Sequence, residues 1–247
     1  MGSPITWFEI AVPSPEQAAK FYAELFGWHT ESPGGGYFLV DTHSGRGMNG
    51  GITEPGVRAG TRSLFYAQGP DIQALLDKAG SLGGQTVVPV TEIPGTVTYA
   101  FFSDPWGNQV GLTTGFAGGA PVSAGDNPTV DWVEISCAEP EKAWAFYREL
   151  FGWTIDADMS GEGGGPVHGS FDTGSSRGAR GGIGGSRDGE AHVDIYASVD
   201  DLAKYLERAE GIGAKILMPA TKVDERTEIG MFADPQGTVF GLYSRAD

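Results

Sequence analysis

The sequence contains few cysteine, lysine and arginine residues. Its 247 residues include one cysteine, Cys137, which excludes an internal disulfide and is typical of a reducing compartment. Lysine and arginine number 16 against 32 acidic residues, and the formal net charge is −16. Such a surface repels phosphate backbones and anionic lipids. We therefore expect neither nucleic acid nor a membrane surface as a partner.

Long apolar runs are also missing. No stretch reaches the roughly 20 apolar residues of a membrane-spanning helix. The start, Met1-Gly-Ser-Pro4, lacks the basic and apolar regions of a signal peptide. We expect a cytoplasmic protein that is a monomer or a homodimer. Cys137 falls on the strand face expected to lie under a helix, which favours a small core residue over a nucleophile.

A repeated stretch organises the chain. Residues 7–28 and 132–153 are identical at 13 of 22 positions, including Phe-Tyr and the closing Glu-Leu-Phe-Gly-Trp. Each stretch begins with the alternation of a two-faced strand and continues with apolar residues at helical spacing. Ser14-Pro15-Glu16-Gln17 predicts a capping-box helix start, and Gly27 predicts a helix C-cap. On the two strands, Phe8, Ile10, Val133 and Ile135 share the helix side, and Trp7, Glu9, Trp132 and Glu134 share the other.

A second pattern, Asp-Pro-x-Gly, recurs at Asp104 and Asp234. It predicts a tight reversal between two strands, in which the aspartate bonds its own backbone and does not act as an acid or base. Residues 116–128 are rich in glycine and predict a linker. We therefore expect two domains, residues 1–115 and 129–247, each large enough for its own core.

Together, Ala-x-x-Phe-Tyr, Leu-Phe-Gly-Trp and Phe-x-Asp-Pro-x-Gly-x-x-x-Gly-Leu resemble the vicinal oxygen chelate superfamily of glyoxalases, bleomycin resistance proteins and dioxygenases. The nearest likeness is to its tandem two-domain actinobacterial antigen or hydroxylase-like branch. The resemblance implies an α+β fold, a tandem repeat of two glyoxalase-like domains. Each domain contains two βαβββ modules that form an incomplete barrel around a cavity, and Trp7, Glu9, Trp132 and Glu134 then line that cavity.

The resemblance also implies where metal ligands belong. In the first half the ligand positions hold Trp7, about Gly51, Leu64 and Gly111, and in the second half Trp132, about Gly182, Asp194 and Gly241. Asp194 alone can bind a cation there, and one carboxylate cannot complete a zinc or iron site. We predict no cofactor and no resident metal. A divalent metal on an off-pattern ligand set stays as the alternative.

Glycines at ligand positions leave open volume, and the tryptophans supply a broad, flat wall. Such a cavity suits a planar, largely apolar small molecule, such as a specialised metabolite or antibiotic, oriented by a few polar groups. In the alternative interpretation the tryptophans simply plug the barrel, and the protein has a structural or antigen-like role. The predicted ligand-binding residues are Trp7, Glu9, Tyr66, Trp132, Glu134 and Tyr243.

A catalytic alternative rests on residues 192–199. Strand parity places His192, Asp194 and Tyr196 on one face, where a histidine beside a carboxylate is suited to act as a general base and the tyrosine as a proton donor. With Glu134 they form the predicted catalytic set of a lyase, isomerase or oxygenase. The competing interpretation is a solvent-edge histidine and a tyrosine bonded to backbone. No role is assigned to His29, His43 or His168.

Overall fold

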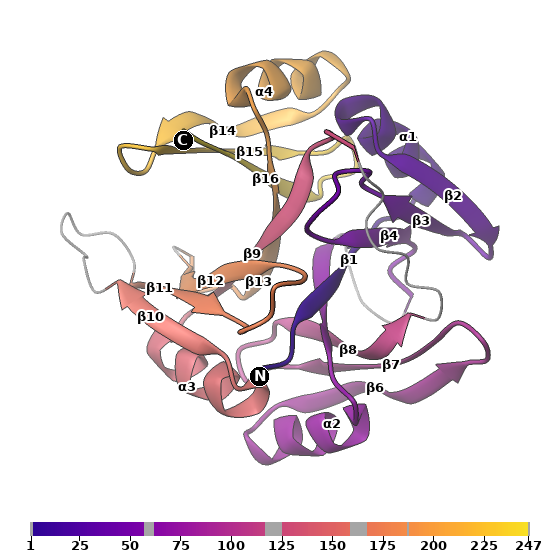
Figure 1. Cartoon of the computed structure of the whole chain (residues 1–247), viewed down its shortest axis with the longest axis vertical. Coiled ribbons are helices and arrows are strands. Elements are labelled where there is room, and N and C mark those ends of the chain that lie inside the picture. Colours follow the sequence, from indigo (N-terminus) through magenta and orange to yellow (C-terminus); the bar gives the residue numbers. More distant parts are fainter. Residues whose placement is uncertain (1, 57–61, 117–124, 159–166, 187, 247) are drawn as a thin grey trace. The chain divides into compact units, whose positions relative to one another are not determined.

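The computed structural model describes residues 2–56, 62–116, 125–158, 167–186 and 188–246. These residues form four modules, and each module has one strand, one helix and three further strands (Figure 1). Module one contains β1 (Ile5–Ala11), α1 (Pro15–Phe26), β2 (His29–Gly34), β3 (Tyr37–Asp41) and β4 (Asn49–Thr53). Module two contains β5 (Arg62–Gln68), α2 (Ile72–Ser81), β6 (Gln85–Ile93), β7 (Val97–Ser103) and β8 (Gln109–Phe116). Module three contains β9 (Thr129–Cys137), α3 (Pro140–Phe151), β10 (Thr154–Asp158), β11 (His168–Asp172) and β12 (Arg180–Gly185). Module four contains β13 (His192–Ser198), α4 (Leu202–Gly211), β14 (Lys215–Lys222), β15 (Thr227–Ala233) and β16 (Val239–Arg245).

The strands of the described residues form two eight-stranded sheets, so the predicted α+β class and the βαβββ modules are confirmed. One sheet has the order β2-β3-β4-β1-β5-β8-β7-β6, and the other has the order β10-β11-β12-β9-β13-β16-β15-β14. In each module the first strand pairs in parallel with the last, and the last three strands are antiparallel. The end strands β6 and β14 carry Pro89 and Pro219, and each has shifts in its pairing register nearby.

The modules group into two compact units. Of the described residues, those up to Thr6, from Phe65 to Phe116 and from Trp132 to Val193 form unit one, and the others form unit two. Unit one therefore holds α2 and α3, and unit two holds α1 and α4. The sequence left open how modules pair, and this grouping joins most of modules two and three and most of modules one and four.

The aromatic motifs of unit two form its core. Helix α1 has proline at its first position, buries Tyr22 and Phe26, and ends at Gly27 with a left-handed φ of 75°. The next residue, Trp28, packs on Phe26 with ring centroids 4.4 Å apart and on Phe8 at 5.7 Å. Its indole N–H donates to the carbonyl of Pro128 at 3.0 Å. The Gly-Trp pair therefore turns the chain out of the helix and returns an aromatic ring to the core.

Unit one repeats this arrangement with its own residues. Trp153 stacks on Phe171 at 4.2 Å and on Tyr147 at 5.6 Å, and its side chain is 1% exposed. Its indole N–H donates to the carbonyl of Ser3 at 2.7 Å. A buried tryptophan with a satisfied N–H contributes both apolar burial and orientation, and removal of such a ring typically costs about 3–5 kcal/mol.

The predicted capping box at Ser14 is wrong. Ser14 is the N-cap residue of α1, but its side chain makes no capping hydrogen bond. Instead, the Gln236 side chain accepts from the Ser14 backbone N–H at 2.7 Å and donates to the Ser14 carbonyl at 2.9 Å. A glutamine that is distant in sequence thus satisfies the end of the helix, which local sequence spacing cannot reveal.

The aspartates of the two Asp-Pro-x-Gly turns hold their own backbone, as predicted. Asp104 Oδ1 accepts from the backbone N–H of residues 106, 107 and 108 at 2.8–3.0 Å. Asp234 Oδ1 accepts from the N–H of Gln236 and Thr238. Each aspartate also has a second partner that the turn pattern does not predict. Tyr147 of α3 donates to Asp104, and Tyr22 of α1 donates to Asp234.

Much of the predicted linker, residues 117–124, lies outside the described residues. Its last residues are anchored within unit two. Asn127 donates to the carbonyl of Gly27 at 2.8 Å, and Pro128 accepts from Trp28. Composition alone predicted a flexible connection here, but these two residues are bonded to the loop that follows α1.

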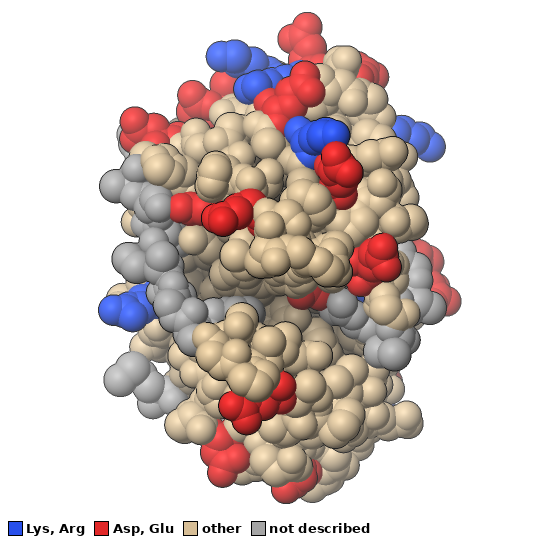
Figure 2. All heavy atoms as spheres, turned by 90° about the vertical axis from the view of Figure 1, so that its right-hand side faces the viewer, with Lys and Arg blue, Asp and Glu red and all other residues tan. Residues whose placement is uncertain are grey.

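The helix-side residues Phe8, Ile10, Val133 and Ile135 have no exposed area, as strand parity predicts. Cys137 is also buried, and burial raises the pKa of its thiol to about 11. This confirms a core role for the cysteine. Acidic side chains are spread over the face in Figure 2 among uncharged ones, in line with the net charge of −16. Within the described ranges, no helix is both long and apolar enough to span a membrane.

Candidate functional site

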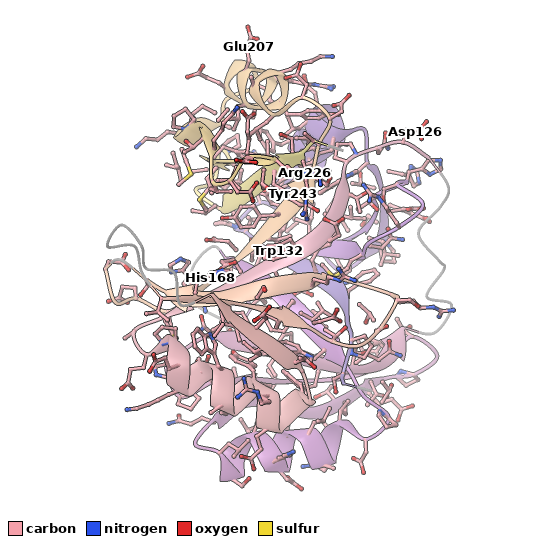
Figure 3. The ribbon with its side chains drawn as sticks, turned by 60° about the vertical axis from the view of Figure 1, so that its left-hand side comes forward. Asp126, Trp132, His168, Glu207, Arg226 and Tyr243 are labelled. Carbon is pink, nitrogen blue, oxygen red and sulfur yellow. The ribbon has the colours of Figure 1, made fainter. Side chains whose placement is uncertain are left out.

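A cluster of three polar side chains lies on strands β9 and β11 of unit one. Trp132 and Glu134 project from the side of β9 opposite the buried Val133 and Ile135. The Trp132 indole N–H donates to Glu134 Oε2 at 3.1 Å. His168, the first residue of β11, brings Nε2 to 2.9 Å from Glu134 Oε1. Both carboxylate oxygens are therefore engaged, one by the indole and one by the imidazole. Trp132 and His168 are labelled in Figure 3.

Glycines of the intervening strand β12 make room for this cluster. In the register, Gly182 faces Glu134 and Gly184 faces His168. A Cβ at Gly182 would overlap both His168 Nε2 and Glu134 Oε2, and one at Gly184 would come within 3.1 Å of the imidazole. The two side chains thus meet above a strand that carries no side chain at these positions. We refer to Trp132, Glu134 and His168 as the module-three cluster.

Module one builds a counterpart within unit two. Trp7 donates its indole N–H to the Tyr37 hydroxyl at 3.3 Å, and Tyr37 donates to Glu9 Oε2 at 3.4 Å. Tyr37 is the first residue of β3, as His168 is of β11, and a Cβ at Gly51 would overlap its ring and hydroxyl. The module-one cluster therefore has a tyrosine where module three has a histidine.

The two clusters differ in access to solvent. Trp7 and Glu9 are 8% and 3% exposed. In module three, the side chains of Glu134 and His168 are 18% and 42% exposed, and Trp132 is half-buried. Tyr37, like His168, is half-buried. The clusters therefore differ at the tryptophan and the glutamate, which are buried in module one and half-buried in module three.

The three predicted catalytic residues of β13 differ in their surroundings. His192 is exposed, and its Nδ1 lies 3.1 Å from the carbonyl of Glu190. Asp194 is 7% exposed. The Tyr196 hydroxyl donates to the Met231 sulfur at 3.7 Å. Glu134, the fourth member of that set, pairs with His168 of β11. The catalytic assignment of these residues stays a prediction.

The two remaining predicted ligand-binding tyrosines lie in separate surroundings. Tyr66 of unit one is 5% exposed and packs edge-on against Phe101 at 5.2 Å. Tyr243 of unit two is half-buried, and its hydroxyl donates to Asp131 Oδ1 at 2.7 Å. Burial, followed by the neighbouring Asp131 charge, raises the pKa of Tyr243, and burial also raises the pKa of Asp131. Tyr243 is labelled in Figure 3.

The glycines at the implied metal-ligand positions do not leave open volume, which corrects the sequence-based expectation. Side chains of neighbouring strands cover them, so a Cβ would overlap a side chain at each position. Tyr66 covers Gly111, Tyr196 covers Gly241, Tyr37 covers Gly51, and the Glu134–His168 pair covers Gly182.

The donor set at these positions does not fit a metal centre. Of the eight positions that the resemblance implies, Asp194 alone carries a metal-binding side chain. Across the described part of the chain, no group of three histidine, cysteine or acidic side chains is arranged to hold an ion. A zinc site normally needs at least three protein ligands. The prediction that no metal or cofactor is bound remains untested.

Sequence reasoning missed His168 and Tyr37. A signal for both was present, because residues 37–52 and 168–183 align without a gap through a shared Asp-Thr and a shared Gly-Gly-Ile. This alignment puts Tyr37 and His168 at one position of the repeat, four residues before the Asp-Thr pair. Pairing of that position with the glutamate of the first strand depends on sheet register, which the sequence does not state.

The fold and the repeated cluster define a tandem glyoxalase-like protein. Residues 5–112 match the family model for the Glyoxalase/Bleomycin resistance protein/Dioxygenase superfamily, and residues 132–243 match the Glyoxalase-like domain model. The chain belongs to this superfamily.

Similar proteins cover most of the chain. CFP32 of Mycobacterium tuberculosis, which carries the name of a glyoxylase, is 25% identical over 99% of this chain and 95% of its own length. The anthracycline biosynthesis protein DauV of a Streptomyces species is 29% identical over 61% of each chain. Among solved structures, the Mn(II)-bound glyoxalase from Novosphingobium aromaticivorans shares the fold, with TM-score 0.72, 15% identity and coverage of 100% of this chain and 83% of its own. The 2,3-dioxygenase LapB from Pseudomonas sp. KL28 gives a TM-score of 0.70 at 14% identity, covering 100% and 94%.

Proposed function

We propose that this protein binds a planar, largely apolar small molecule at the module-three cluster. The observation that carries the proposal is the contrast in solvent exposure between the tryptophan and glutamate of two equivalent clusters. Trp7 and Glu9 are buried, whereas Trp132, Glu134 and His168 are partly exposed. A partly exposed indole beside an ordered carboxylate offers a flat stacking surface together with a polar anchor.

The polar groups of the cluster suit a ligand that carries a hydroxyl or a carbonyl group. Glu134 accepts hydrogen bonds, and His168 can donate or accept one according to its tautomer. Because Glu134 bonds both neighbours, these groups are pre-oriented, and a ligand loses less entropy on binding to them. A planar aromatic ring with polar edges matches this combination of contacts.

A named relative points to the same ligand class. DauV is named an anthracycline biosynthesis protein, and anthracyclines as a chemical class contain a planar fused-ring anthraquinone core. The shared region covers 61% of this chain. We therefore choose a neutral hydroxyanthraquinone as the probe.

Isothermal titration calorimetry with this probe tests the proposal. We expect Trp132→Ala to weaken binding by about tenfold or more, equivalent to ~1.4 kcal/mol. Trp132→Phe keeps a flat ring but loses the indole N–H, so we expect a smaller loss. Trp7→Phe is the matched control at the equivalent position of module one and should leave the affinity unchanged. Wild-type affinity in Trp132→Ala would place the ligand elsewhere.

Metal-free binding is part of the proposal, supported by the poor donor set at the implied ligand positions. Elemental analysis of protein purified without chelators should give well under one metal ion per chain. Stoichiometric zinc, iron, nickel or manganese would overturn this part of the proposal and favour an off-pattern metal site. The calorimetric result on Trp132 would still report on ligand binding.

The Glu134–His168 contact favours one second candidate, a lyase or isomerase that moves a proton. A carboxylate that pairs with an imidazole fixes the orientation of the ring, as in the arrangement of a general base. Deuterium exchange at an acidic C–H of a bound ketone, followed by NMR, tests this candidate. His168→Gln should abolish the exchange if His168 is the base. If the catalytic set predicted from the sequence operates, His192→Gln should abolish it.

A further inference from the structure

The two Asp-Pro-x-Gly turns differ at the residue after proline. Module two has Trp106 there and module four has Gln236, while the flanking aspartate, proline and glycine are the same. Each turn lies beside the helix whose tyrosine bonds its aspartate, α3 for Asp104 and α1 for Asp234. The two units therefore have the same type of turn beside a helix, with a different side chain at the position after proline.

In unit one, an indole covers the helix surface beside the turn. Trp106 packs edge-on against Phe146 of α3, with ring centroids 6.1 Å apart and an interplanar angle of 88°. Its N–H donates to Glu139 Oε2 at 3.3 Å. The aromatic ring and its hydrogen bond thus occupy the space between the turn and the start of α3.

In unit two, a pocket lies beside the corresponding turn. Gln236 turns to Ser14 and bonds its backbone N–H and carbonyl, so its side chain lies against the N-terminal end of α1. A cavity of about 310 Å³ remains, with a lining that includes Gln17, Ala18 and Phe21 of α1, Ile212 after α4, and Pro235 and Gln236 of the turn. Phe21 aligns with Phe146, and the volume is at the low end of the roughly 300–1,000 Å³ of small-molecule pockets.

We propose that this pocket binds a small free aromatic molecule of about the size of indole, with its ring against Phe21. The chain itself supplies the comparison, because an indole lies against the equivalent Phe146 in unit one. Edge-on aromatic pairs are favourable beyond the burial of the two rings. The site consists of unit-two residues and shares no residue with the module-three cluster.

The remaining lining restricts the charge of the ligand. Lys20 and Glu24 lie at the pocket from α1, and Asp234 contributes from the turn. Lys20 is paired with Glu16, and Asp234 accepts bonds from Tyr22, Gln236 and Thr238. These bonds engage most of the charge around the pocket within the protein, which favours a neutral ring with one polar N–H or O–H over a strongly charged ligand.

Reciprocal exchange of the two turn residues tests the proposal. We would titrate ¹⁵N-labelled protein with indole and follow backbone amide shifts. In the wild type, the amides of Phe21 and Gln236 should shift, with a Kd on the order of 1 mM for so small a ligand. Gln236→Trp should abolish these shifts because the new side chain occupies the pocket. Trp106→Gln should create a second set of shifts around Phe146. Each substitution introduces a residue that the equivalent turn already carries.

Gly80→Ala in α2 serves as the control, since Gly80 is not part of the pocket, a Cβ there meets no atom within 4 Å, and indole binding should be kept. Gln236→Tyr is a second filling variant if Gln236→Trp does not fold. The absence of shifts at Phe21 in the wild type, or their persistence in a folded filling variant, would overturn the proposal. No new shifts in Trp106→Gln would also count against it, because the geometric comparison would then fail. The amides of Glu134 and His168 report the proposed function separately.

Discussion

The hydroxyl of Tyr147 donates to Asp104 Oδ2 at 2.8 Å, and both groups are buried. Tyr22 makes the same bond to Asp234 at 3.2 Å in the other unit. The Phe-Tyr motif of one module is thus bonded to the Asp-Pro turn of another. These two motifs, more than 40 residues apart in the case of Tyr147 and Asp104, form one structural element in each unit.

Loss of this hydroxyl should destabilise the fold. In Tyr147→Phe, the buried Asp104 carboxylate loses one donor while its other partners remain, so we expect a cost of ~1–3 kcal/mol in the free energy of unfolding. Chemical denaturation followed by circular dichroism measures it. Tyr205 of α4 is half-buried, and Tyr205→Phe is the control. It should change the free energy of unfolding by less than about 0.5 kcal/mol. An equal effect in both variants would contradict a specific role for the Tyr147–Asp104 bond.

The same carboxyl makes stability depend on pH. Burial raises the pKa of Asp104 above its ordinary 3.8, against the opposing effect of its hydrogen bonds. A group with a raised pKa in the folded state contributes stability below its unfolded pKa, and that contribution is lost as the pH rises through the folded pKa. The stability deficit of Asp104→Asn relative to the wild type should therefore be larger near pH ~4 than near pH ~7. A constant or growing deficit across this interval would refute the assignment.

The glycine between Glu134 and His168 should be required for ligand binding. A methyl group in Gly182→Ala would overlap both side chains and separate them. We expect the affinity for hydroxyanthraquinone to fall by about tenfold. Gly80→Ala in α2 is the matched control, since a Cβ there meets no atom within 4 Å. Calorimetry should give wild-type affinity for Gly80→Ala, and equal losses in both variants would indicate a general effect.

Cys137 should be inert in the folded protein. It has no exposed area, and burial raises the pKa of its thiol to about 11, so little thiolate exists at neutral pH. A thiol reagent should label it only after denaturant is added. Rapid stoichiometric labelling of native protein, counted by mass spectrometry, would show that the strand opens readily.

The modules could be predicted well from the sequence because local residue patterns determine the strands and helices of each module. Strand alternation placed Phe8 and Val133, and Gly27 marked the end of α1. The candidate site was harder to predict. Sheet register, together with glycines that carry no side chain, determines which of its residues meet. Neither the His168–Glu134 contact nor the replacement of the Ser14 capping box by Gln236 leaves a local signal. The interpretation of the glycines as open volume was wrong for the same reason, since side chains of neighbouring strands cover these positions.

Prolines in the end strands β6 and β14 affect whether two molecules of this protein can associate by strand pairing. Pro89 and Pro219 have no amide hydrogen to offer, and the pairing beside each is irregular. A strand from a second molecule that paired with β6 or β14 would form an interrupted ladder of hydrogen bonds. A homodimer should therefore not pair through β6 or β14, which leaves the opposite end strands β2 and β10 and the other surfaces, and the same interruption protects β6 and β14 against fibrous aggregation.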